Sequence, residues 1–498
     1  MLKRRASGIL LHPVSLPGRF GIGDLGEAAF HFIDFLKACA QHYWQIMPLG
    51  PTGYGDSPYA SFSAFAGNPL LINPDRLVQD NLLPPQALEE VPNFPSHKVD
   101  YGWVIDYKFK VLNQSYEYFT ANGNADLKDE FIQFCQMHQS WLDDFAFFMA
   151  LKDVFRGNAW VSWDREIATR QPAAVTRWKR RLETPVHAHK YFQFIFFLQW
   201  QSVKKYANDH DIQIIGDVPI FVAHDSADVW AHPELFYLDK NGNPRVVAGV
   251  PPDYFSTTGQ LWGNPLYRWD ALAQSNYQWW IDRVKATLQT VDMIRIDHFR
   301  GFEAYWEVSA SETTASNGRW VKGPEAALFR AMQEQFGDLS FIIAENLGFI
   351  TPEVEDLREQ FEFPGMKVLQ FAFNSDANNP DLPHNFTANN VVYTGTHDND
   401  TTVGWYLNSG NPEEHDYYRR YTDRSGDDVA WDFIRLALSS VANLAIIPLQ
   451  DFLGLNSEAR MNFPSKASGN WSWRFTPEML RPDLIQRLND MVHLFGRA

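Results

Sequence analysis

The chain has 498 residues, of which 45% are hydrophobic and 21% are charged, a composition that is typical of a folded globular protein and excludes general disorder. Its 60 Asp and Glu residues outnumber its 43 Lys and Arg residues, so the net charge is −17. This acidic balance disfavours nucleic acids and membrane surfaces as partners, because both are negatively charged.

Neither the cysteines nor the apolar segments indicate export. Cys39 and Cys135 are the only two cysteines, and neither belongs to a disulfide framework or a metal-binding motif. The apolar stretch 9–11 behind the basic N-terminus is too short for a secretory signal, and no segment approaches the roughly 20 apolar residues of a membrane helix. We expect a cytoplasmic protein, or one of the plastid stroma if the source is a plant.

Short apolar runs that end at a polar or acidic residue recur along the whole chain. Continuous runs of this length are typical of strands that are buried on both faces of a parallel sheet. Helical patterns over 25–40, 191–206 and 276–290 precede the second, third and fourth runs. Eight strands alternating with helices predict an α/β protein, a (β/α)8 TIM barrel. The runs cover residues 8–11, 44–48, 212–217, 293–297, 341–345, 368–373, 391–394 and 444–449.

Two gaps between these runs are too long for a single helix. We expect one catalytic barrel over 1–498, with an inserted subdomain at about 50–211 after the second strand and another at about 225–270 after the third. The first insertion has helical patterns of its own, such as 141–154. The end of the chain, 477–495, reads as helix, so no C-terminal β-sandwich domain is expected.

Four of the predicted strands end in, or are soon followed by, a carboxylate. One such acid alone is more often a helix cap than a catalytic group. Four on one rim repel each other, which indicates metal binding or acid–base chemistry at the C-terminal end of the barrel. A metal site is disfavoured because no HxH pair, HExxH motif or EF-hand-like loop accompanies the acids. The four are Asp217, Asp297, Glu345 and Asp398.

The neighbours of these acids suggest their roles. Arg295 and Asp297 are two apart on a strand and point the same way, so the guanidinium keeps the acid ionised, as a nucleophile requires. Glu345 follows an apolar run, and dry surroundings favour a protonated carboxyl, as a proton donor requires. His298 and His397 could bind a ligand or could be buried histidines with structural hydrogen bonds. A structural ion pair of Arg295 with Asp297 predicts the same geometry.

Three segments, R-I-D-H at 295–298, A-E-N at 344–346 and T-H-D-N at 396–399, resemble the late catalytic motifs of the α-amylase clan. Within that clan the chain resembles the amylomaltases, the 4-α-glucanotransferases of glycoside hydrolase family 77, nearly from end to end. Further matching segments lie at 44–59, 61–69, 216–222, 248–253, 260–265, 450–451, 457–462 and 469–471.

The resemblance implies a role for each matching residue. Asp297 would be the nucleophile and Glu345 the general acid/base of a retaining mechanism, and Asp398 would stabilise the oxocarbenium-like transition state. The substrate-binding residues would be Tyr59, Asp217, Arg295, His298, His397, Asn346 and, on an acceptor-side loop, Asp253 and Trp262. The ligands would be α-1,4-glucans such as maltodextrin or amylose, with glucose as an acceptor, and no cofactor or metal is implied. The protein would be a monomer or a homodimer.

A hydrolase of α-1,4-glucans is the nearest alternative, because cleavage of the donor is the same chemistry. Hydrolytic amylases carry a His a few residues after the acid that corresponds to Asp217, whereas Phe221 and Val222 occupy that stretch here, which favours the transferase. A non-catalytic glucan-binding protein is the other alternative, but it would keep the aromatic residues and would not need acids at strand ends.

Overall fold

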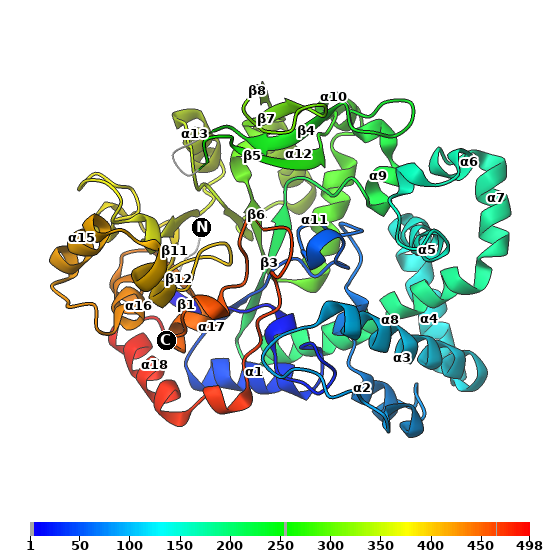
Figure 1. Cartoon of the computed structure of the whole chain (residues 1–498), viewed down its shortest axis with the longest axis horizontal. Helices are drawn as coiled ribbons and strands as arrows, with labels where there is room; N and C mark the ends of the chain where they lie inside the picture. The colour runs from blue at the N-terminus through cyan, green and yellow to red at the C-terminus, as the bar shows by residue number, and fades with distance from the viewer. Residues whose placement is uncertain (1–3, 253–255, 465) are drawn as a thin grey trace.

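In a computed structural model, which describes residues 4–252, 256–464 and 466–498, the chain forms a closed barrel of eight parallel strands (Figure 1). The strands close in the order β1-β12-β11-β10-β9-β6-β3-β2. Every residue of β1 and β12 is buried, as expected for strands covered on both faces. The predicted TIM barrel is therefore confirmed. Its strands are β1 (Ala6–Leu10), β2 (Tyr43–Gln45), β3 (Gln213–Pro219), β6 (Met293–Asp297), β9 (Ile342–Ala344), β10 (Gly365–Val368), β11 (Asn390–Tyr393) and β12 (Leu444–Pro448).

The sixth barrel strand lies earlier than its apolar run predicts. The strand β10 pairs with β11 from Gly365 to Val368, and the expected run 368–373 begins where this strand ends. Residues 369–371 form a 3-10 turn, in which Leu369 is buried without any sheet pairing. The run is therefore apolar because the turn is buried. Periodicity alone does not distinguish a buried turn from a strand.

Helices surround the barrel, and the three helical patterns expected before its second, third and fourth strands are present. Pattern 25–40 corresponds to α1 (Glu27–Ala38), pattern 191–206 lies within α8 (Glu183–Asp209), and pattern 276–290 corresponds to α11 (Gln278–Thr290). The α8 helix contacts both α1 and β3, so its C-terminal part belongs to the outer layer of the barrel. Further along the chain, α12 (Ala326–Phe336) contacts α11 and α16 (Val429–Ser439) contacts β12, and α13 (Pro352–Gln360) connects β9 to β10.

The chain between β2 and β3 is mostly helical and lies on the right of Figure 1. The α5 helix of this region packs on α8, which links the region to the barrel. Aromatic side chains pack in this contact, including Trp141 of α5 and Phe197 of α8, whose ring centroids are 6.1 Å apart. The helices before α8 are α2 (Pro74–Gln79), α3 (Tyr101–Asn122), α4 (Ala125–Met137), α5 (Gln139–Val154), α6 (Arg165–Ala168) and α7 (Pro172–Arg181).

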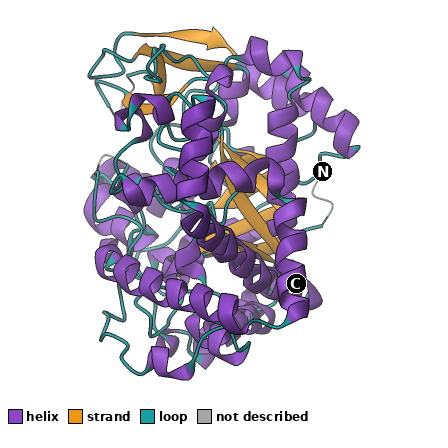
Figure 2. Ribbon diagram, turned by 90° about the vertical axis from the view of Figure 1, so that its right-hand side faces the viewer, coloured by secondary structure: helices purple, strands orange, loops and turns teal. Residues whose placement is uncertain are grey.

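A four-stranded antiparallel sheet stands apart from the barrel, at the top of Figure 2. Its order is β5-β4-β7-β8, with β4 (Val246–Val250), β5 (Gln260–Pro265), β7 (Ala304–Ser309) and β8 (Gly318–Lys322). The first two strands follow β3, together with α9 (Ala227–Ala231) and α10 (Trp269–Gln274), whereas the last two follow β6. The sequence did not predict the strands that follow β6.

After β12 the described residues form helices and loops. The last helix, α18 (Pro482–Leu494), contacts α1 and α16, so the end of the chain packs on the barrel helices. The remaining helices of the C-terminal third are α14 (Thr402–Gly404), α15 (Pro412–Thr422) and α17 (Leu449–Phe452). None of the helices in the described part of the chain combines the length and the apolar character that a membrane crossing requires.

The barrel interior is filled by alternate residues of its strands, as the two-residue period of a strand requires. Ile215, Met293 and Ile343 belong to this apolar interior cluster. The residues two positions further along the same strands therefore point inward as well, one layer closer to the C-terminal end of the barrel. That layer holds the polar residues described next.

Candidate active site

Three neighbouring strands carry charged residues in the layer above the apolar interior. Asp217 on β3 and Arg295 on β6 are partners in the parallel ladder. Ile296 on β6 pairs with Ala344 on β9, so Asp297 and Glu345 follow at adjacent positions. Because neighbouring strands lie about 4.8 Å apart, this register suits two carboxyls that act on one bond.

Arg295 lies between two carboxylates. Its Nη1 is 2.7 Å from Oδ2 of Asp217 and 2.9 Å from Oδ1 of Asp297. Burial opposes its charge, but Asp217 and Asp297 hold the pKa of Arg295 above its usual value, so the guanidinium stays protonated. Burial also raises the pKa of Asp217, while Arg295 lowers it. The sequence predicted the contact of Arg295 with Asp297 but not the one with Asp217.

Glu345 and Asp297 differ in their surroundings. Glu345 is only 8% exposed, whereas the side chain of Asp297 is 28% exposed. The carboxyl oxygens of Glu345 accept hydrogen bonds from the backbone N–H groups of His298 and Leu347, both at 2.7 Å. Burial raises the pKa of Glu345 to about 7. The positive charge of Arg295 opposes this rise, whereas the negative charge of Asp297 adds to it. At neutral pH Glu345 can therefore both hold and release a proton.

Asp398 lies in the loop after β11, and its side chain is 46% exposed. Its Oδ1 accepts a hydrogen bond of 2.6 Å from Nδ2 of Asn462, and its backbone carbonyl accepts one of 2.5 Å from Arg460. His397 Nε2 lies 3.4 Å from Oδ2 of the same carboxylate. Asn462 and Arg460 were noted only as members of a matching segment, and their contact with Asp398 could not be found from the sequence.

An aromatic group borders the acids. The hydroxyl of Tyr59 donates a 2.7 Å hydrogen bond to Asp217, and its ring stacks on His397 with centroids 5.1 Å apart. Burial and then the charge of Asp217 raise the pKa of Tyr59, so this hydroxyl keeps its proton. The ring of Trp471 lies 5.7 Å from Tyr59 and 5.9 Å from His397. Trp471 is a further residue of the site to which the sequence assigned no role.

His298 connects the acids to the antiparallel sheet. Its backbone is left-handed, with φ of 57°, and its N–H binds Glu345. The ring lies edge-on to Trp262 at 4.8 Å, and Nε2 has no hydrogen-bond partner among the described residues. Burial lowers the pKa of His298 to about 4, so the imidazole is neutral. Asp253, the other residue expected on the acceptor side, lies outside the described residues.

Asn346 has a different set of partners from the other expected substrate-binding residues. Its Nδ2 donates to Glu355 on α13 at 2.7 Å, and its Oδ1 accepts from the backbone N–H of Met366 on β10 at 2.8 Å. Both ends of the amide are therefore used to hold β10 and α13 beside Glu345. No pattern in the sequence indicates this role, because the partners depend on how the loops pack.

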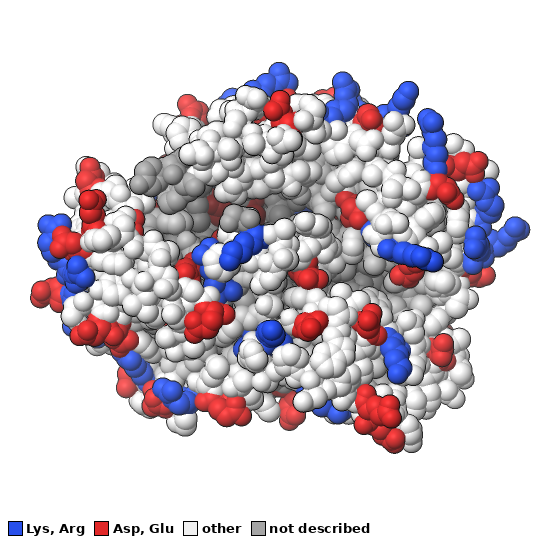
Figure 3. Space-filling model, in the orientation of Figure 1, with Lys and Arg blue, Asp and Glu red and all other residues white. Residues whose placement is uncertain are grey.

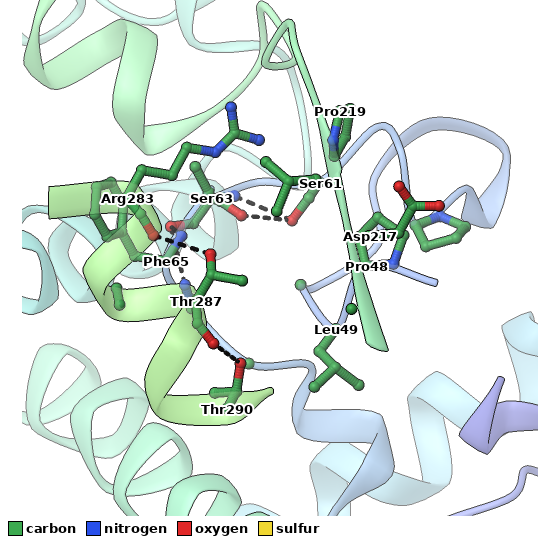
Figure 4. Close-up of a pocket in the computed structure, with 18 of the residues that line it drawn as sticks. Pro48, Leu49, Ser61, Ser63, Phe65, Asp217, Pro219, Arg283, Thr287 and Thr290 are labelled. Carbon is green, nitrogen blue, oxygen red and sulfur yellow. Dashed lines mark hydrogen bonds between the residues drawn. The ribbon is translucent and has the colours of Figure 1, made fainter. Parts of the chain in front are cut away.

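The molecular surface is hollowed next to the four-stranded sheet. Figure 3 shows a groove below the upper lobe, with acidic side chains at its floor. A separate cavity of about 80 Å³ lies largely behind the barrel wall, between β3, α8 and α11. In Figure 4 Arg283 and Thr287 lie on one side of β3, and the carboxyl of Asp217 lies on the other. Among the described residues, no group of three or more His, Cys, Asp or Glu side chains is arranged so that it could hold a metal ion.

Comparisons with known proteins agree with this arrangement. The family model of glycoside hydrolase family 77, 4-alpha-glucanotransferase, matches residues 11–480. The chain is 53% identical to the 4-alpha-glucanotransferase of Synechocystis over 499 residues, which cover 100% of the chain and 99% of that protein. It is 50% identical to the 4-alpha-glucanotransferase of Thermus thermophilus, with 99% of each covered. A chloroplastic/amyloplastic 4-alpha-glucanotransferase of Arabidopsis thaliana is 43% identical, with 99% of the chain and 86% of that protein covered.

Solved structures show the same likeness in three dimensions. The amylomaltase of Streptococcus agalactiae in complex with acarbose superposes with a TM-score of 0.96 at 39% identity, covering 99% of the chain and 100% of that structure. The amylomaltase of Corynebacterium glutamicum shares the fold with a TM-score of 0.82 at 18% identity, covering 100% of the chain and 76% of that structure. The chain therefore belongs to glycoside hydrolase family 77, the family of the 4-α-glucanotransferases, and is an enzyme of that class.

Proposed function

We propose that the enzyme transfers α-1,4-glucan segments from a donor maltodextrin to the 4-hydroxyl of an acceptor glucan or glucose, with retention of configuration through a covalent glycosyl-enzyme. The observation that carries this proposal is the contrast between two adjacent acids. Asp297 is accessible and paired with Arg295, whereas Glu345 is buried with its pKa raised to about 7. One is suited to attack and the other to give and take a proton.

In the first step a carboxylate oxygen of Asp297 forms a bond to C1 of the donor glucosyl unit. The bond from C1 to the leaving O4 breaks, and the proton of Glu345 goes to that oxygen. In the second step the acceptor 4-hydroxyl attacks C1, its proton returns to Glu345, and the ester to Asp297 breaks. Each step inverts C1, so the product keeps the α configuration.

The other residues bind and orient the sugar in this proposal. Asp398, which Asn462 and His397 hold at the rim, stabilises the positive charge that develops on the sugar ring. Arg295 pairs with Asp297 at 2.9 Å and so helps to orient it. Tyr59, Asp217 and His397 contact the cleaved glucosyl unit, His298 and Trp262 serve the acceptor side, and Asn346 positions the loop of Glu345. Asp253, which lies outside the described residues, is assigned to the acceptor side from the family resemblance alone.

The ligand proposed here agrees with one of the solved relatives. The S. agalactiae amylomaltase binds acarbose, an α-linked pseudo-oligosaccharide, and that structure covers 99% of this chain. We infer that the groove of Figure 3 accepts an α-glucan in the same way.

Incubation with maltotriose as the only substrate tests the proposal. We expect glucose together with a series of chains longer than maltotriose, because the glycosyl-enzyme reacts with a sugar hydroxyl before it reacts with water. Chromatography of the products over time makes the measurement. Release of glucose and maltose without longer chains would mean that the enzyme is a hydrolase.

Substitution of Asn462 by Ala tests whether Asp398 must be held in place. We expect kcat to fall about 10- to 100-fold, because a misplaced group next to the reacting centre loses about that much. The thermal midpoint should stay the same, since Asn462 is only partly buried. Asn408→Ala is the matched control, because its amide also bonds to a nearby loop but not to Asp398. Equal kcat values for the two variants would show that Asn462 is not needed to hold Asp398 in place.

A further inference from the structure

Exposed aromatic rings gather around the turn that follows the nucleophile strand. Trp320 is 37% exposed and Phe349 is 68% exposed, although large apolar side chains are usually buried. Trp262, at 39% exposure, contacts the same turn through His298, but it belongs to β5, at the opposite edge of the sheet from Trp320 on β8. The exposed aromatic pair at this edge is therefore Trp320 and Phe349, and exposed apolar side chains that lie together mark binding surfaces.

The rings of Trp320 and Phe349 are held in place by one arginine. The guanidinium of Arg300 lies 3.7 Å from the ring centroid of Trp320 and 5.9 Å from that of Phe349. Its Nη1 also donates a 2.6 Å hydrogen bond to the carbonyl of Phe349. On its other side, Trp320 packs edge-on against Trp306 at 5.2 Å. The two exposed rings are therefore preorganised, which lowers the entropic cost of binding.

This pair of rings is linked to the proton donor through the turn of His298 and Arg300 and through the loop that follows Glu345. Arg300 is two residues after His298, whose N–H binds Glu345, and Phe349 is four residues after Glu345 in the loop between β9 and α13. Trp320 is on β8, an edge strand of the antiparallel sheet. In Figure 1 β8 and α13 lie in the same upper part of the molecule. Because Glu345 faces the oxygen that leaves and the oxygen that enters, the pair lies on the acceptor side.

The chemistry of the pair fits a neutral sugar chain. Arg300 is only 5% exposed and is covered by the rings, so it offers no free cation to an anionic ligand. The net charge of −17 also disfavours anions. Aromatic faces stack on the C–H faces of glucosyl rings and tolerate a chain of any length. The two segments that carry Arg300 and Phe349 also carry His298 and Glu345, so the pair is attached to the elements that form the proposed glucan site.

We propose that Trp320 and Phe349 form an outer acceptor subsite, on which a glucan stacks several units beyond the bond being made. The inference rests on the proposed transfer reaction. This subsite makes the enzyme prefer long acceptors, because glucose fills only the position next to Glu345 and does not reach the two rings.

The test compares Trp320→Ala, Phe349→Ala and the double variant with the unmodified enzyme, using α-maltosyl fluoride as donor. Transfer to glucose and to maltoheptaose is measured separately, each over a range of acceptor concentrations. We expect KM for maltoheptaose to rise about fivefold to tenfold in each single variant, the size of one aromatic contact, with kcat unchanged. The values for glucose should change less than about twofold.

Two kinds of control separate stacking from folding. Trp320→Tyr and Phe349→Tyr keep an aromatic face and should restore the low KM for maltoheptaose. Ile132→Ala removes an exposed side chain, 51% exposed on α4, and should change neither acceptor. An equal loss with both acceptors, no change with either, or a change of oligomeric state in sedimentation of the double variant would overturn the proposal. Absence of transfer by the unmodified enzyme would instead overturn the transfer reaction itself.

Discussion

Asp297→Asn is expected to lower kcat for glucan transfer by about 10⁴-fold or more, because removal of the group that forms the covalent intermediate removes the whole reaction path. The amide keeps the size of the carboxylate but is a poor nucleophile. Arg295 remains paired with Asp217 at 2.7 Å, so the site should keep its shape. Transfer from maltotriose, followed by chromatography, gives the measurement.

The thermal midpoint of Asp297→Asn should stay within about 3 °C of the unmodified enzyme. Loss of the ion pair with Arg295 is offset by relief of the repulsion between Asp297 and the neighbouring acids Asp217 and Glu345. Asp75→Asn is a suitable control, because Asp75 also pairs with an arginine, Arg19, but at the surface and outside the site. A nucleophile variant that keeps more than about one hundredth of the activity would contradict the role of Asp297.

Glu345→Gln is expected to lower kcat for maltotriose by about 10²- to 10⁴-fold, the usual contribution of a general acid or base. Gln is close in shape to Glu but cannot transfer a proton. With α-maltosyl fluoride as donor the first step should proceed, because fluoride leaves without a proton. The second step should stay slow, since no base takes the acceptor proton. Fluoride release followed in time separates the two steps.

The same residue should set the alkaline limb of the pH profile. Burial raises the pKa of Glu345 to about 7, so the proton is present below this pH and is lost as the pH rises through it. Donor cleavage needs that proton, so kcat/KM of the unmodified enzyme should fall above pH 7. The residual activity of Glu345→Gln should lack this limb. An alkaline limb of the same midpoint in both enzymes would assign it to another group.

Seven of the eight barrel strands could be predicted, because each shares most of its length with a continuous apolar run. The exception is β10, which shares only Val368 with the run 368–373, because residues 369–371 form a 3-10 turn. The strand β8 could not be predicted from burial, because it is an exposed edge strand with few apolar residues. The pairing of β7 with β4 joins segments that follow different barrel strands.

The site was predictable where it depends on spacing within one strand. The two-residue period placed Arg295 beside Asp297, and the apolar run before Glu345 predicted its dry surroundings. The pair of Arg295 with Asp217 depends on the register between two strands, and the support of Asp398 by Asn462 joins residues that are 64 apart. Contacts of this kind leave no periodic signal in a sequence.

Glu345→Gln also provides the most direct test of the central claim, that a carboxylate at position 297 carries the sugar between donor and acceptor. The variant is incubated with α-maltosyl fluoride, quenched in acid, digested and analysed by mass spectrometry. We predict a maltosyl ester on the peptide that contains Asp297, with fragmentation that places it on that residue. A glycosylated peptide from elsewhere in the chain, or fluoride release with no glycosylated peptide, would contradict the mechanism.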